Sequence, residues 1–176
     1  MKEYNFTEAT HLITFLKVNH DKIVGKCLKN LYIDYWFDSY CSSFTCEDII
    51  IELGACFISI NYRFKSNLTI TVGTKEEMLQ NRFFASIINM KYETEDYYNI
   101  KLDSGIRSAE IEGRMVNRIS VEQFSEAFEC NPVTGEIRPE GGDYFSTIRL
   151  CLDGGRTLCF CGANSMANGY TCVWCE

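Results

Sequence analysis

Four cysteines near the C-terminus have the types and spacing that come closest to a chemical motif. Cys159 and Cys161 form a C-x-C pair, and Cys172 and Cys175 form a C-x-x-C pair. Tetrahedral zinc takes four thiolates, and short spacings pre-assemble ligand pairs. A zinc site made by these four cysteines is therefore one interpretation of this segment.

The elements expected to carry the cysteines argue against that interpretation. Both pairs fall in alternating segments that read as β-strands, where residues two apart share a face but lie about 6.5 to 7 Å apart. Cys172 and Cys175 are three apart, so in a strand they point to opposite faces, and no glycine or proline separates them. A thioredoxin-like C-x-x-C opens a helix, which this one does not. We expect no metal, no redox chemistry and no cofactor, with zinc as the alternative.

The hairpin before these cysteines turns at Asp153–Gly155, and its loop length decides which way they face. A three-residue loop pairs Leu150 with Leu158, whereas a two-residue loop would pair Leu150 with Cys159 and turn the cysteines inward. We prefer the three-residue loop because it matches an earlier hairpin in the chain. The face away from the core then carries Arg149, Cys151, Thr157, Cys159 and Cys161.

That earlier hairpin alternates from Cys56 to Phe64 and again from Leu68 to Val72, which is the period of a half-buried strand. A three-residue loop at Lys65–Asn67 makes Tyr62 face Ile70. The pattern therefore predicts two antiparallel strands.

Helical signals stand on both sides of this hairpin. Before it, residues 7–19 place Leu12, Ile13 and Leu16 on one apolar stripe, which predicts an N-terminal helix. After it, "TKEE" at residues 74–77 has the form of a capping box and predicts a helix over 75–81. We expect a strand through residues 83–90.

Two pairs of segments match at one common offset of 88 residues. Ile23–Asp34 matches Ile111–Glu122, and Glu52–Val72 matches Glu140–Phe160 without a gap. A shared offset indicates an internal duplication.

The predicted fold is α+β, with mostly antiparallel sheet, an N-terminal helix and short connecting helices. Its two tandem related β-meander halves are residues 1–90 and 91–176, and they form one compact globular unit. The repeated pattern, a glycine and a basic residue before spaced aliphatic residues and then a hairpin, resembles that of small uncharacterised bacterial β-meander domains. The resemblance covers about 23–90 and 111–176 and implies a fold type without a catalytic motif.

Composition narrows the range of partners. The 176 residues carry 24 acidic and 17 basic side chains, a net charge of −7, without a long run of either sign. Nucleic acid and anionic membranes are disfavoured, because both require a basic surface. No apolar run approaches the roughly 18 residues of a membrane span, and Glu3 and Glu8 do not suit a signal peptide. We expect a cytoplasmic protein, in which the ten cysteines are free thiols.

No constellation of acid, base and nucleophile stands out, and the only two histidines, His11 and His20, have no evident partner. Enzymatic activity is therefore not expected, and no catalytic residue is assigned. The polar face of the two hairpins is the candidate recognition surface, although such a face is also often solvated or covered by a helix. Its candidate partner-binding residues are Asn61, Arg63, Thr71, Arg149 and Thr157.

These observations favour a non-catalytic cytosolic module that binds another protein, of the kind found among bacterial immunity and adaptor proteins. The acidic charge favours a basic partner. Two alternatives remain open besides zinc binding: a small-ligand-binding protein, or an enzyme, with a pocket between the two halves.

Overall fold

A computed structural model describes residues 1–7, 9–38, 43–62, 68–89, 111–124, 127–130, 137–140, 144–164 and 169–176. Antiparallel strands dominate, as the α+β prediction requires. The strands are β1 (Lys2–Phe6), β2 (Leu28–Asp38), β3 (Ser43–Leu53), β4 (Cys56–Tyr62), β5 (Leu68–Gly73), β6 (Val116–Phe124), β7 (Ala127–Cys130), β8 (Ile137–Glu140), β9 (Tyr144–Leu152), β10 (Thr157–Asn164) and β11 (Gly169–Cys175). The helices are α1 (Ala9–Val18), α2 (His20–Ile23), α3 (Lys75–Gln80) and α4 (Arg82–Asn89).

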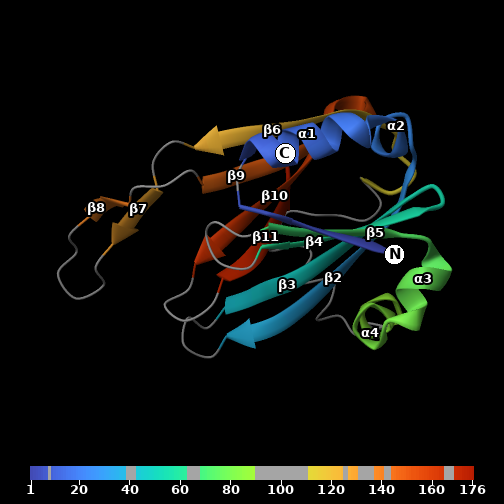
Figure 1. The fold of residues 1–176 in the computed structure, drawn as a ribbon, viewed down its shortest axis with the longest axis horizontal. Helices are drawn as coiled ribbons and strands as arrows, with labels where there is room; N and C mark the ends of the chain where they lie inside the picture. The colour runs from blue at the N-terminus through green and yellow to red at the C-terminus, as the bar shows by residue number, and fades with distance from the viewer. Residues whose placement is uncertain are drawn as a thin grey trace.

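In the described part of the chain, nine strands form one sheet, in which β3 pairs with three other strands. The hydrogen-bonded order is β1-β5-β4-β3-β11-β10-β9-β6, and β2 pairs with the other edge of β3. The end of β3 pairs with β4, while its beginning meets β11 at Cys46 opposite Thr171. Strands β7 and β8 form a separate hairpin at the side of the molecule (Figure 1).

The sheet closes on itself where β2 and β6 begin. The amide of Gly25 donates to the carbonyl of Val116 at 2.8 Å, and the amide of Gly113 donates to the carbonyl of Leu28 at 2.7 Å. Both glycines have positive φ angles, 76° and 82°, which glycine adopts without steric cost. Strands β2, β3, β11, β10, β9 and β6 therefore follow one another around a ring, converging at this end and splaying at the other (Figure 1).

Helix α1 contributes to the core that this ring encloses. Leu12 and Leu16 are buried, as the predicted stripe requires. The third predicted member, Ile13, is only half-buried, and Phe15 is buried instead. The ring of Phe15 packs against that of Tyr4 of β1 in a tilted arrangement, with centroids 4.6 Å apart and an interplanar angle of 52°. Strand β1 was not expected from the sequence, and it pairs with β5 and gives α1 a surface to pack on.

The hairpin β9–β10 has the predicted register. Leu150 pairs with Leu158, so the three-residue loop is confirmed. Gly154 and Gly155 in that loop both have positive φ. The register prediction for β4–β5 was wrong by two residues, because Tyr62 pairs with Leu68 instead of Ile70. The proposed loop at 65–67 lies outside the described residues, and the shift keeps every side chain on its predicted face.

Each half contains a four-strand meander, β2-β3-β4-β5 and β6-β9-β10-β11. In this order β4 corresponds to β10, whereas the gap-free sequence match at offset 88 places β4 against β9. The β7–β8 hairpin, which follows β6, accounts for the difference because it lengthens the connection to β9. The duplication as a whole stays a prediction.

The helix at α3 is confirmed, together with its capping box. The Glu77 amide donates to Thr74 Oγ1 at 3.3 Å, and the Thr74 amide donates to a Glu77 carboxylate oxygen at 2.9 Å. The expected strand over 83–90 is wrong, since α4 occupies 82–89. The spacing of Phe84 and Ile87 is helical, and both side chains pack with Met78 in a second cluster outside the ring.

Replacing Thr74 by alanine should cost about 1 kcal/mol of unfolding free energy, because the first turn of α3 loses its side-chain acceptor. Urea denaturation would measure the loss. Thr10→Ala changes an exposed threonine within α1 and should move the midpoint far less. Equal shifts would contradict a role for the cap.

The outer face of β2 and β3 carries a buried carboxylate with two partners. Glu52 is 9% exposed and accepts from Asn30 Nδ2 at 2.6 Å and from the Tyr32 hydroxyl at 3.0 Å. Burial, followed by the hydrogen bond to Glu52 and its charge, raises the pKa of Tyr32 to about 12.

This raised pKa predicts a loss of stability at alkaline pH. The folded state favours the neutral phenol, so the contribution of Tyr32 is complete below the ordinary pKa of 10.0 and disappears as pH rises towards 12. Tyr32→Phe should flatten this part of the curve of unfolding free energy against pH, because the phenol whose pKa is raised is then absent. Parallel curves for wild type and Tyr32→Phe would contradict the assignment.

Candidate functional site

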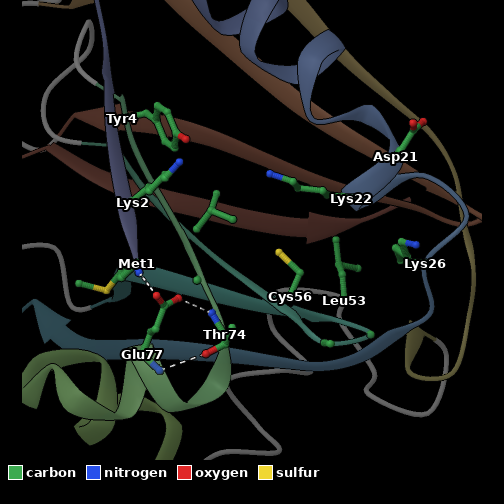
Figure 2. Close-up of a pocket in the computed structure, with 14 residues that line it drawn as sticks. Met1, Lys2, Tyr4, Asp21, Lys22, Lys26, Leu53, Cys56, Thr74 and Glu77 are labelled. Carbon is green, nitrogen blue, oxygen red and sulfur yellow. Dashed lines mark hydrogen bonds and ion pairs between the residues drawn. The ribbon is translucent and has the colours of Figure 1, made fainter.

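An open groove of about 650 Å³ lies at the end of the molecule where β1, β5 and the β3–β4 turn approach α2. The first turn of α3 completes its wall (Figure 2). Among the residues that the structure describes, all of those lining the groove fall between Met1 and Glu77, in the N-terminal part of the chain. It is not the pocket between two halves that one alternative required.

Three of the described residues that line the groove are lysines. Lys22 extends from α2 towards β1, where Lys2 and Tyr4 point to the same space, and Lys26 lies on the rim (Figure 2). Lys22 Nζ donates to Asn19 Oδ1 at 3.1 Å, which fixes the direction of this ammonium. The cationic groups come from β1, α2 and the segment before β2, so only the fold brings them together.

The two acidic residues of the lining do not neutralise this cluster directly. Asp21 is fully exposed and its carboxylate points away from the groove (Figure 2). Glu77 is held by the amino group of Met1 at 2.5 Å and by the amide of Thr74. The hydrogen bonds from these two groups hold the pKa of Glu77 below its ordinary value, so its carboxylate is ionised and already paired.

The floor of the groove is apolar and carries one thiol. Leu53, Val72 and Cys56 line the groove. The Cys56 sulfur points into the open space (Figure 2). Burial raises the pKa of Cys56, and the nearby Lys22 charge partly offsets this rise. The thiol is therefore neutral at neutral pH and a weak nucleophile. The arrangement suits binding of an anionic group with an apolar neighbour.

A second cavity lies inside the ring between the halves but has a volume of only about 20 Å³. Its wall is wholly apolar, formed by side chains that include Ile51, Ile58, Ile119 and Leu150. A space of this size holds at most about one water molecule, and an apolar wall gives that water no partner. This cavity is a packing defect of the core, too small for a ligand.

The predicted partner-binding residues fall in two separate places. Asn61 and Thr71 lie on β4 and β5, where Thr71 is 2% exposed and Asn61 donates to Asp48 at 2.7 Å. Arg149 on β9 and Thr157 on β10 share an outer face, and these strands are the third and the second beyond β3 in the sheet order. Arg63 lies outside the described residues.

Arg149 binds other residues of its own face. It donates to a Glu176 carboxylate oxygen at 2.6 Å and to the sulfur of Cys159 at 3.6 Å. Cys159 is fully buried, and this burial raises the pKa of its thiol to about 11.

The C-terminal cysteines occupy both faces of β10–β11. Cys159 lies on the outer face with Arg149, whereas Cys175 packs against the core. Cys161 and Cys172 are register partners, a pairing that the sequence reasoning missed, and their side chains lie outside the description. In the part of the chain whose side chains are described, no three histidine, cysteine or acidic residues gather as metal ligands. The predicted absence of zinc stays a prediction.

Comparison with known proteins gives no relative, since no family model, no curated protein and no solved structure matches the chain. None of the helices in the described ranges has the length and apolar character that crossing a bilayer requires.

Proposed function

We propose that the protein is a non-catalytic module that binds another protein and that the groove is its binding site. The observation that carries the proposal is the shape of the groove, which is open to solvent over an apolar floor. A protruding segment of a partner can enter such a groove. A catalytic pocket more often encloses its substrate and excludes water.

The chemistry of the lining supports binding over catalysis. Among the described lining residues there is no histidine, and the Cys56 thiol has a raised pKa. Glu77 is held by the capping box and is not placed as a general base. The groups that do converge are ammonium groups and apolar surface, which recognise a ligand without transforming it.

We place this module in the cytoplasm and among proteins of the immunity and adaptor kind. All five cysteines whose side chains are described are free thiols, namely Cys27, Cys56, Cys151, Cys159 and Cys175. Free thiols suit a reducing compartment.

Blocking the groove tests the proposal. Ala55 is exposed on the groove wall, so Ala55→Trp should fill the space without disturbing the core. Affinity capture from the native host, followed by mass spectrometry, should recover a partner with wild type and lose at least nine-tenths of it with Ala55→Trp.

Two controls locate the effect. Arg82→Trp adds the same side chain at an exposed position of α4 outside the groove lining and should leave capture unchanged. Arg149→Glu tests the polar face of β9–β10. If Arg149→Glu loses the partner and Ala55→Trp keeps it, the groove is not the interface.

We also propose that the two meanders are copies of one unit related by an approximate twofold axis. Support comes from the place where the ring of strands closes, because Cys27 forms an antiparallel β-bridge there with Met115, the residue 88 positions later. Two backbone hydrogen bonds flank this contact, from the amide of Gly25 to Val116 and from the amide of Gly113 to Leu28. Gly113 lies 88 residues after Gly25, and Val116 lies 88 residues after Leu28, so each bond is the equivalent of the other. Superposing β2-β3-β4-β5 on β6-β9-β10-β11 in an experimental structure tests this, and strands crossing at unrelated angles would exclude it.

A further inference from the structure

We infer that the groove recognises an acidic segment of the partner, with a carboxylate seated between Lys2 and Lys22 above Cys56. This inference rests on the proposed function and names the chemistry of its ligand. It depends on three observations: the lysines point into the groove, the nearby carboxylates are either paired or turned away from it, and the floor is apolar.

The lysines retain donors that an anion can use. An ammonium group has three donors, and the bond from Lys22 to Asn19 uses one of them. Lys2 pairs in register with Val72, so its side chain stands on the same face of the sheet as the groove floor. In Figure 2 both ammonium groups point into the space above the Cys56 sulfur.

The net charge of −7 by itself favours a basic partner, so the attraction for an acidic segment must come from the lysines of the groove. At physiological salt the Debye length is about 8 Å, which screens most of the remote charge behind the net value of −7. Lysines in direct contact with a ligand are screened much less. An acidic segment would therefore bind through contacts in the groove, without long-range steering by the whole molecule.

The floor favours a peptide over other anions. Leu53, Val72 and the neutral Cys56 thiol offer apolar contact beside the ammonium groups. A nucleic acid would need an extended basic track, for which the net charge gives no support. A segment that alternates acidic and aliphatic residues satisfies both parts of the groove, with carboxylates on the lysines and aliphatic side chains on the floor.

Fluorescence anisotropy with a labelled octapeptide of alternating glutamate and valine tests the inference on the full chain. Wild type should bind this peptide, and a peptide with glutamine in place of glutamate should bind at least about tenfold more weakly. Lys22→Glu and Lys2→Glu should each weaken binding about tenfold or more, which corresponds to about 1.4 kcal/mol. Lys29→Glu makes the same charge change at an exposed position outside the groove lining and should weaken it less than about twofold.

Alkylation of Cys56 by iodoacetamide, followed by peptide mapping, locates the bound peptide. Saturating glutamate peptide should protect Cys56 and leave Cys27 unprotected. Equal binding of the glutamine peptide, or equal losses in Lys29→Glu and Lys22→Glu, would overturn the acidic preference. Should Lys22→Glu fold poorly, Lys22→Gln replaces it with an expected loss of about threefold or more.

The failure of this inference is distinguishable from the failure of the proposed function. If neither peptide protects Cys56 but Ala55→Trp still abolishes partner capture, the acidic ligand is wrong and the groove remains the interface. If Ala55→Trp leaves capture intact, the proposed function itself falls.

Discussion

Phe160→Ala is expected to lower the unfolding free energy by about 3 to 5 kcal/mol, the range for removing a buried phenylalanine ring. Phe160 is fully buried on β10 inside the ring. Its carbonyl accepts from the hydroxyl of Tyr62 on β4 at 3.4 Å, so the residue stands where the two meanders meet. Truncation would leave a cavity bounded by strands of both halves, which a rigid closed sheet cannot collapse to fill.

The same substitution at an exposed phenylalanine separates the effect of burial from the effect of removing the ring. Phe83 is 44% exposed on α4 and touches Phe84 edge-on. Phe83→Ala should cost at most about 1 kcal/mol, because surface changes have small effects. Both variants can be compared by urea denaturation, and equal midpoints would mean that β10 is not part of the core.

Glu52→Ala is expected to cost about 2 to 3 kcal/mol, because it leaves the donors of Asn30 and Tyr32 without their acceptor. Glu52→Gln should cost less, since an amide oxygen can still accept one bond. Glu3→Ala removes an exposed carboxylate from β1 and should change the unfolding free energy by less than about 0.5 kcal/mol. A loss for Glu52→Ala no larger than that for Glu3→Ala would contradict the role of the buried carboxylate.

Features set by neighbouring residues were predictable from the sequence. The capping box at Thr74 needs only four residues, and the β9–β10 register follows from a loop whose two glycines allow positive φ. The helix α4 was missed because the adjacent Phe83 and Phe84 are typical of a strand. In the structure, Phe84 and Ile87 lie on one face of a helix, where they pack in the second cluster. Strand β1 was missed because its pairing with β5 is set far along the chain.

The candidate site could not be predicted from the sequence, because its residues come from separate elements that only the fold brings together. Lys2, Lys22 and Cys56 lie on β1, α2 and β4, and no motif links them in sequence. A lysine on an exposed helix and a cysteine in an alternating strand are common features, so neither carries a signal alone. Conversely, the polar alternation that suggested Thr71 as a contact residue could not reveal that this side chain is 2% exposed.

The pairing of β3 with β11 has a consequence for biosynthesis. The edge of β3 at Cys46 pairs with Thr171, so the ribosome must synthesise every residue between these two before the sheet can be completed. At about 5 to 20 residues per second this takes roughly 6 to 25 s. For that interval the nascent N-terminal meander has an unpaired strand edge at the beginning of β3, to which neighbouring nascent chains can add strands. Slowing translation in the second half should therefore increase aggregation during expression, and a chaperone that shields strand edges should reduce it.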